Sequence, residues 1–211
     1  MEIRYEKAFF QIVNFLEKIE REFGIKYYLV GGILVSIYSE TRTTQDIDFV
    51  VDIYSVNHNL DTYITILKKN EFFPIQDWDS AAKLAKDIHL LQFLDKQQII
   101  KFDNYIIDQK SLSNYKKIGP LGLKRRLKIN FAGIECWVAS KEDYILSKLV
   151  FGGWQDYSDA LGCWLRFENE LDKDYLELNS KKLDIHKECV LLRSGIDDPD
   201  EFFNKLRDID P

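Results

Sequence analysis

The segment from Tyr28 to Ile53 constrains the fold of this chain more than any other stretch of its 211 residues. It contains an apolar run, a glycine pair, a polar loop and a second apolar run that opens with Asp46-Ile47-Asp48. Because side chains alternate between the two faces of a strand, Asp46 and Asp48 are expected to project from the same face. Two adjacent carboxylates repel each other unless a proton or a cation lies between them, and Mg²⁺ prefers oxygen ligands. The segment is therefore a candidate metal and phosphate site.

A glycine pair, Gly31-Gly32, lies between the expected strand Tyr27–Val30 and a short helix. Free backbone N–H groups and the positive end of the helix dipole at such a position favour an anion, for example a triphosphate. Both features also have ordinary structural explanations. A glycine pair commonly forms a tight turn, and an Asp-x-Asp pair commonly marks a solvated strand end.

A third acid, Asp103, lies inside the apolar run IIKFDNYII, which predicts a strand over Gln98–Ile107. A carboxylate in such a strand is costly to bury unless it has a partner or a metal ion. One alternative places Asp103 on the exposed face of the strand, paired with Lys101. The other gives it a functional role, with a metal ion as its partner inside the strand.

A resemblance to a known family supports the second alternative. The pattern of Gly31-Gly32 followed by Arg42-x-Thr44-x-Asp46-x-Asp48 and an apolar strand resembles the nucleotidyltransferase superfamily, which has the DNA polymerase β type of catalytic fold. Within it, the chain is most similar to the bacterial nucleotidyltransferase-like proteins that include the AbiEii-type toxins.

Further along, SKEDYILSKLVFGGWQDYSDA resembles the part of the same family where a lysine and then an aspartate follow a helix start, and Lys148 and Asp156 occupy those positions. The chain departs from the family at Ile33-Leu34, where small residues are usual.

The resemblance implies a set of site residues. Divalent metal, Mg²⁺ or Mn²⁺, is expected on the three aspartates, and the triphosphate of a nucleoside triphosphate, ATP among them, on the glycine turn and its flanking loop. The residues implied as catalytic are Asp46, Asp48, Asp103 and Lys148; those implied for nucleotide binding are Gly31, Gly32, Arg42 and Thr44.

The implied reaction moves a nucleoside monophosphate to a hydroxyl acceptor. That acceptor is the end of an RNA, typically a transfer RNA, or a protein, and the enzyme is expected to be the toxin of a toxin–antitoxin pair, with an antitoxin protein as partner. Two alternatives stay open. One is an inactive nucleotide- or protein-binding module of the same fold, and the other is a nucleotidyltransferase acting on a small molecule of the aminoglycoside type.

Charge and composition bound the location and the partners. The formal net charge of −6 argues against a general nucleic-acid coat protein. A basic run from Lys116 to Lys128 forms either a solvated face or a contact for phosphates of RNA or nucleotide. The three cysteines have no C-x-x-C spacing, and neither a signal peptide nor an apolar run of about 20 residues is present. We expect a cytoplasmic protein with no membrane partner.

The remaining pattern predicts an α/β (α+β) protein, with a mixed β-sheet of nucleotidyltransferase type flanked by helices. Helices are expected near Tyr5–Phe23 and Asn57–Lys69, and two hairpins turn at Asp95-Lys96 and at Gly133. Phe72–Ala85 has no clear period, and its aromatic residues either pack or line a cleft. We place a catalytic domain at residues 1–139 and a C-terminal helical bundle, packed on it, at 140–211.

Overall fold

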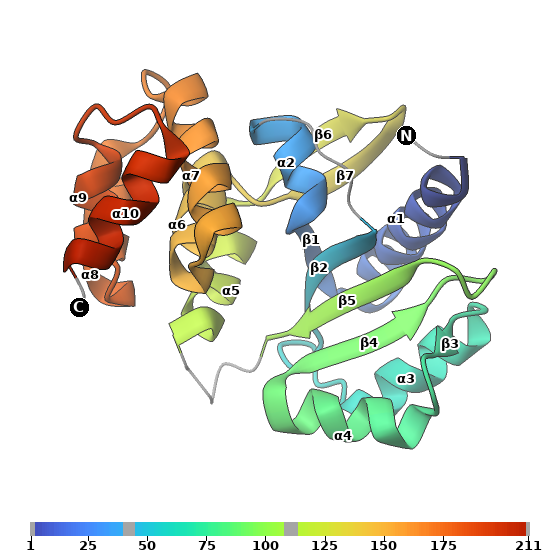
Figure 1. Ribbon diagram of the computed structural model, residues 1–211. Coiled ribbons are helices and arrows are strands. Elements are labelled where there is room, and N and C mark those ends of the chain that lie inside the picture. Colours follow the sequence, from blue (N-terminus) through green and yellow to red (C-terminus); the bar gives the residue numbers. More distant parts are fainter. Residues whose placement is uncertain (1–2, 40–44, 108–113, 210–211) are drawn as a thin grey trace. The chain divides into compact units, whose positions relative to one another are not determined.

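The computed structural model describes residues 3–39, 45–107 and 114–209. These ranges contain ten helices and seven strands. Figure 1 shows the course of the chain through them. The elements are α1 Ile3–Phe23, β1 Lys26–Val30, α2 Gly32–Tyr38, β2 Asp46–Asp52, α3 Leu60–Lys69, β3 Phe73–Pro74, α4 Trp78–Ile88, β4 Leu90–Leu94, β5 Lys101–Ile106, α5 Asn114–Arg125, β6 Leu127–Phe131, β7 Ile134–Val138, α6 Lys141–Phe151, α7 Trp154–Phe167, α8 Lys173–Leu183, α9 His186–Leu192 and α10 Pro199–Ile209.

The seven strands form one sheet in the order β3-β4-β5-β2-β1-β7-β6. Strand β2 pairs antiparallel with β1 and parallel with β5, and β1 pairs parallel with β7. The outer pairs β3–β4, β4–β5 and β6–β7 are antiparallel. The predicted fold class, an α/β protein with a mixed sheet flanked by helices, is therefore confirmed.

One face of the sheet packs against a cluster of phenylalanines. Phe93 and Phe102 of β4 and β5 lie with ring centroids 5.4 Å apart, and both contact Phe72 at 5.3 and 5.7 Å. Phe49 of β2 contacts the same two strand rings, and Phe15 of α1 contacts Phe72. Because strand side chains alternate, burying Phe49 and Phe102 on this face directs the even-numbered residues of β2 and the odd-numbered residues of β5 to the other face.

The segment Phe72–Ala85, which the sequence left open, contains a two-residue strand and most of helix α4. Asp77 caps this helix, since its carboxylate accepts a hydrogen bond from the Ser80 N–H at 2.8 Å. Trp78 packs with its ring centroid 6.4 Å from that of Phe93, while Phe73 is exposed. Packing therefore explains Phe72 and Trp78.

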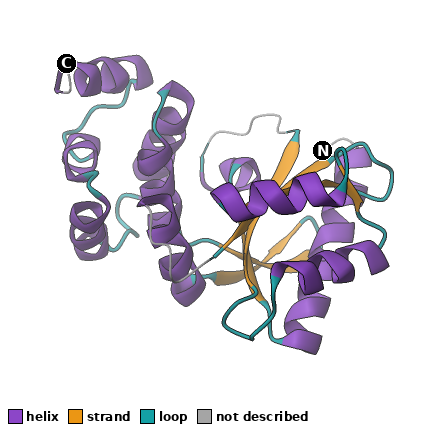
Figure 2. Cartoon of the chain, turned by 90° about the horizontal axis from the view of Figure 1, so that it is seen from below, coloured by secondary structure: helices purple, strands orange, loops and turns teal. Residues whose placement is uncertain are grey.

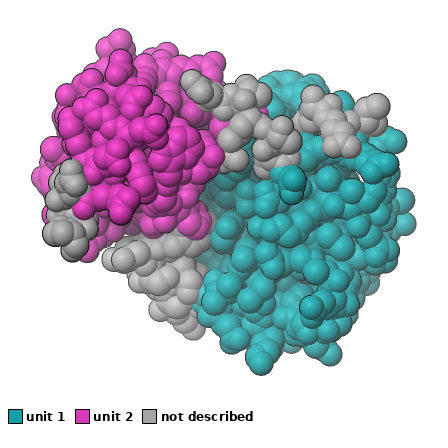
Figure 3. Space-filling model, in the orientation of Figure 1, with its two compact units in different colours: residues 1–33, 43–111, 126–139 teal, residues 34–42, 112–125, 140–211 magenta. Residues whose placement is uncertain are grey.

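The chain divides into two compact units, coloured separately in Figure 3. The first consists of residues 1–33, 43–111 and 126–139 and contains the whole sheet; the second consists of residues 34–42, 112–125 and 140–211. Figure 2 shows that the C-terminal part of the chain is helical, and α6 to α10 follow one another there without a strand in the described residues. No helix in the described ranges is both long and apolar enough to cross a lipid bilayer.

Candidate acidic site on strands β2 and β5

Three predicted acids come together on the face of the sheet opposite the phenylalanine cluster. In the parallel pairing of β2 with β5, Asp48 lies opposite Asp103, and Asp46 lies opposite Lys101. Residues paired in this way across neighbouring strands point to the same face, as do residues two apart on one strand. Asp46, Asp48, Lys101 and Asp103 therefore occupy one patch, which we call the acidic site.

Lys101 bridges two strands within this site. Its Nζ lies 2.8 Å from Asp103 Oδ2 and 3.3 Å from Asp46 Oδ2. The other oxygen of Asp103, Oδ1, accepts a hydrogen bond of 2.9 Å from Gln92 Nε2 on β4. The Asp103 side chain is only 11% exposed, so both of its oxygens are held in place in a largely buried position. Asp103 pairs with Lys101, as one sequence alternative expected, but it is largely buried rather than on an exposed face of the strand, and it shares its face with Asp46 and Asp48.

Asp48 packs against the glycine turn. Gly31 has a φ of +64°, and a Cβ atom placed there would lie 2.1 Å from Asp48 Oδ2. No side chain fits in that position, and the backbone conformation is one that glycine adopts without strain. The neighbouring Gly32 N–H, at the start of α2, donates to Asp48 Oδ2 at 3.3 Å. The glycine pair therefore allows a carboxylate to approach the backbone where strand β1 turns into α2.

Among the described residues, the site brings three carboxyl groups close to one ammonium group, and burial and charge together shift the pKa values of Asp48 and Lys101. Burial, then the charges of Asp46 and Asp103, raise the pKa of Asp48 from 3.8 to about 7, against the opposing effects of the Gly32 N–H and Lys101. Burial by itself lowers the pKa of Lys101, but the hydrogen bond and charge of Asp103 together with Asp46 outweigh it and raise that pKa. One ammonium group thus faces three carboxyl groups.

The donor chemistry of the acidic site fits a hard divalent cation. Three carboxyl groups supply oxygen ligands, and their charge exceeds that of the single ammonium beside them. In the described part of the chain, however, no three His, Cys, Asp or Glu side chains already stand in an arrangement that could hold a metal ion. Instead, Asp46 and Asp103 form ion pairs with Lys101 Nζ, and Asp48 accepts a hydrogen bond from the Gly32 N–H.

Lys148, the fourth residue predicted to be catalytic, lies on α6 in the second unit. Its side chain is 8% exposed, and its Nζ lies 2.8 Å from Asp156 Oδ1 and 2.7 Å from Asp159 Oδ2 on α7. Two carboxylates therefore neutralise this buried cation. Asp156 was expected from the sequence but Asp159 was not, although a second acid three residues further on falls on the same face of a helix.

The structure describes only some of the residues that the sequence placed around the glycine turn. Arg42 and Thr44, predicted to bind the nucleotide, lie outside the described residues. Ile33 and Leu34, the departures from the family pattern, are buried. Large apolar residues at these two positions therefore contribute to packing.

Three cations of the basic run, Arg125, Arg126 and Lys128, are paired with acids of the same chain. In the second unit, Arg125 Nη2 lies 3.2 Å from Glu142 Oε2, and its guanidinium lies over the ring of Tyr175. In the first unit, Arg126 forms two hydrogen bonds with the carboxylate of Glu20 on α1. Lys128 Nζ lies 3.1 Å from Glu17 Oε2. The side chains of Lys116 and Lys117 are outside those described. These ion pairs give Arg125, Arg126 and Lys128 a structural explanation.

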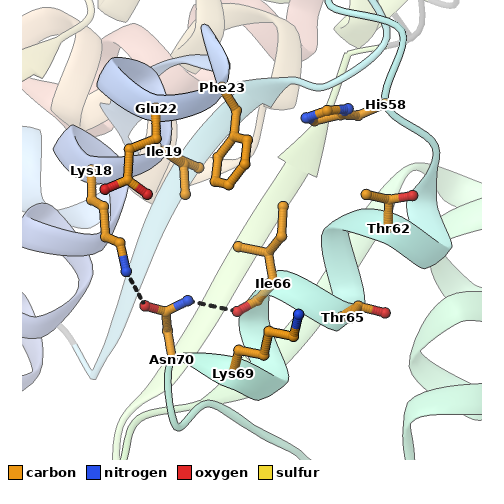
Figure 4. Close-up of a pocket in the computed structure, with 10 residues that line it drawn as sticks. All are labelled: Lys18, Ile19, Glu22, Phe23, His58, Thr62, Thr65, Ile66, Lys69 and Asn70. Carbon is orange, nitrogen blue, oxygen red and sulfur yellow. Dashed lines mark hydrogen bonds between the residues drawn. The ribbon is translucent and has the colours of Figure 1, made fainter.

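A cavity of about 340 Å³ opens in the first unit between α1 and α3 (Figure 4). Lys18, Glu22 and Phe23 of α1 face Ile66 and Lys69 of α3 across it. The cavity shares no lining residue with the acidic site. It therefore gives no substrate pocket for the three aspartates.

Comparisons with known proteins leave the family open. No family model matches the chain, and no curated protein matches it. Among solved structures, the chain is similar to an antigenic nucleotidyltransferase-like protein from Paracoccidioides brasiliensis, with 14% sequence identity and a TM-score of 0.43. That alignment covers 90% of this chain and 94% of the fungal one. A similarity of this size does not establish a function, so the function proposed for the chain is derived from the acidic site.

Proposed function

We propose that the chain is a metal-dependent nucleotidyltransferase that moves a nucleoside monophosphate from a nucleoside triphosphate to a hydroxyl acceptor. One observation supports the proposal above all. Asp46 and Asp48 of β2 and Asp103 of β5 share a face of the sheet, and Asp48 lies directly against the glycine turn that leads into α2. Carboxylates of the kind that bind hard divalent cations are thereby adjacent to a backbone turn of the kind that binds phosphate, which supports the proposal.

The proposed roles divide between the strands and the turn. Asp46, Asp48 and Asp103 hold Mg²⁺ or Mn²⁺, which supplies Lewis acidity and charge neutralisation at the phosphates. The backbone of Gly31 and Gly32 contacts the triphosphate, and the sequence resemblance adds Arg42 and Thr44 as proposed nucleotide-binding residues. The sequence resemblance implies a catalytic role for Lys148, whose charge is neutralised within the second unit by Asp156 and Asp159.

The proposed reaction is an in-line displacement at the α-phosphorus. The acceptor oxygen forms a bond to that phosphorus while the bond to the oxygen bridging the α- and β-phosphates breaks. Pyrophosphate leaves with the electron pair of the broken bond. The proton of the acceptor hydroxyl passes to the carboxylate of Asp103, the proposed general base.

The proposed acceptor is a hydroxyl of RNA, such as a transfer RNA end, or of a protein. Arg125, Arg126 and Lys128 of the basic run do not favour RNA over protein, because they are paired with acids of the chain itself. The further proposal that the enzyme is a toxin controlled by an antitoxin protein rests on the sequence resemblance alone.

A second candidate is an inactive binding module of the same fold. The observation that favours it is the position of Lys101, whose ammonium occupies the space between Asp46 and Asp103. A lysine that permanently replaced the metal ion would leave the fold without its chemistry. The same experiment separates the two candidates.

The test is transfer of label from each α-³²P nucleoside triphosphate in the presence of Mg²⁺ or Mn²⁺. The reaction contains the protein, total RNA and a mixture of protein acceptors, and the products are separated by electrophoresis. We expect metal-dependent labelling of RNA or of protein, reduced by about 100-fold or more in Asp46→Asn and in Asp103→Asn, because each substitution removes a charged ligand and leaves the side-chain shape.

The matched control is Asp87→Asn, which neutralises an exposed aspartate on α4 away from the acidic site. This variant should label its acceptor like the wild type. Labelling that persists in Asp46→Asn would remove the assigned ligand. No labelling of any acceptor with any of the four nucleotides would favour the inactive module.

A further inference from the structure

The position of Lys101 gives the acidic site a cation of its own. Its Nζ lies within 3.3 Å of one oxygen from each of two neighbouring strands, Asp46 Oδ2 on β2 and Asp103 Oδ2 on β5. This placement follows from the register, because Lys101 lies opposite Asp46 and two residues before Asp103 on the same face. The ammonium therefore stands between the carboxylates that a shared metal ion would join.

An ammonium group and a divalent ion cannot use these two oxygens in the same way at once. Mg²⁺ binds carboxylate oxygens at about 2.0–2.1 Å. A divalent ion bound to Asp46 Oδ2 and Asp103 Oδ2 would share both oxygens with Lys101 Nζ, which lies 3.3 and 2.8 Å from them, and the two positive charges would repel each other. Binding of the metal ion is therefore opposed for as long as Lys101 Nζ stays at these oxygens.

The surroundings of Lys101 allow it to move away while Asp103 stays in place. The Lys101 side chain is 35% exposed and carries its charge on a flexible four-carbon stem, so the ammonium can turn into solvent. Asp103, by contrast, is 11% exposed, and Gln92 Nε2 holds its Oδ1 from β4. Its Oδ2 thus stays directed toward the same point when the ammonium leaves.

We propose that Lys101 is a tethered competitor of the divalent cation, which closes the acidic site until a metal ion displaces its ammonium group. The proposal rests on the proposed function, since it concerns the same three carboxylates, and it adds a residue that sets how tightly they bind metal. It also gives a reason why the carboxylates are arranged around a nitrogen atom rather than in an open ligand set.

The experiment compares Mn²⁺ affinities without reference to catalysis. Free Mn²⁺ is followed by electron paramagnetic resonance during titration of the full chain, for the wild type, Lys101→Met and Lys101→Gln. Methionine keeps most of the apolar stem, and glutamine keeps a polar end group. We expect both variants to bind Mn²⁺ at least about tenfold more tightly than the wild type, because the competing charge is gone.

Two controls fix the interpretation. Lys96→Met removes another lysine that pairs with an acid in the same unit, Glu71 at 2.7 Å, and should leave Mn²⁺ affinity unchanged. Asp103→Asn should abolish the binding. A thermal unfolding series provides a second readout: the rise in midpoint on adding Mn²⁺ to metal-free protein should be larger for Lys101→Met than for the wild type.

The possible outcomes separate this proposal from the proposed function. Equal or weaker Mn²⁺ affinity in both Lys101 variants, at a site that Asp103→Asn destroys, would overturn the competitor role and leave the metal site standing. Absence of Mn²⁺ binding from the wild type and from both Lys101 variants would overturn the two proposals together. Tight binding that appears only when Lys101 is replaced would support the competitor role and show why the wild type resists the ion.

Discussion

Asp48 contacts both the glycine turn and the other acids of the acidic site. Its carboxyl group lies against Gly31, accepts the Gly32 N–H and faces two other acids on the same face of the sheet. Period-two alternation was enough to predict from sequence that Asp46 and Asp48 point the same way. The contact between Asp48 and Gly31 was not predictable, because it depends on the register of β1 against β2, in which Val30 lies opposite Asp48.

The raised pKa of Asp48 makes a prediction about stability and pH. The folded protein keeps this proton up to about pH 7, whereas the unfolded chain releases it near the ordinary value of 3.8. Between these values the folded state binds more protons, so its stability falls as pH rises and levels off above about pH 7. Asp48→Asn should therefore stabilise the metal-free protein at pH 8, on the order of 2 kcal/mol, and lose that advantage toward pH 4.

Urea unfolding at a series of pH values in EDTA measures this difference. Asp87→Asn, on the exposed surface of α4, is the control and should shift stability little at any pH. An Asp48→Asn protein that is less stable than the wild type at pH 8 would contradict a strained, charge-crowded Asp48.

The same sequence left the role of Lys101 undecided. In the ordinary structural interpretation the partner of Asp103 was Lys101. In the functional interpretation the partner was a metal ion. The register of β5 against β2 places Lys101 opposite Asp46, so the lysine and the three aspartates lie in the same patch. A parallel pairing between strands separated by about 50 residues is set by the whole sheet, so local pattern alone could not give it.

Among the elements, α4 and α5 are the helices that the sequence analysis did not identify. In α4, Trp78 and its neighbours were interpreted as packing or cleft residues and not as part of a helix. The helix start is nevertheless marked by Asp77, whose side chain accepts a hydrogen bond from the Ser80 N–H. Helix α5 contains Pro120 and two glycines, which are poor helix formers, so its charge pattern was more visible than its period. Helices α1 and α3 have strong apolar stripes and were predicted correctly.

Arg126 links three elements of the first unit, which explains a charge that the sequence could assign to solvent or to RNA. Its guanidinium donates to Glu20 of α1 and to the Tyr27 carbonyl of β1, and it lies over the ring of Trp137 on β7. The side chain is 10% exposed, against 36% for Lys128, which pairs with Glu17. A bidentate pair with little solvent contributes more to stability than an exposed one.

Replacing these two cations should therefore have different effects. Arg126→Met is expected to lower the free energy of unfolding by about 3 kcal/mol, because Glu20 and the Tyr27 carbonyl lose their partner. Lys128→Met should cost less than about 1 kcal/mol. Chemical denaturation of both variants measures the contrast. Equal, small losses would mean that Arg126 is not part of the packing between α1 and the sheet.

For the whole molecule, the class of fold was predictable but the arrangement of the sheet was not. Alternating helices and strands, two hairpins and a helical C-terminal part indicated a mixed α/β protein. The order β3-β4-β5-β2-β1-β7-β6 depends on which distant strands pair, and the short strand β3 has no sequence signal of its own. The domain boundary between residues 139 and 140 stays a prediction.

The proposed function of the whole molecule requires that Asp46, Asp48 and Asp103 act together on a divalent cation. The most direct measurement is anomalous diffraction from crystals of the protein grown with Mn²⁺ and a non-hydrolysable nucleoside triphosphate. We expect an anomalous peak within bonding distance of all three carboxylates, with the Lys101 ammonium turned away from Asp46 and Asp103. Mn²⁺ bound elsewhere, with Lys101 still between the two carboxylates, would contradict the account.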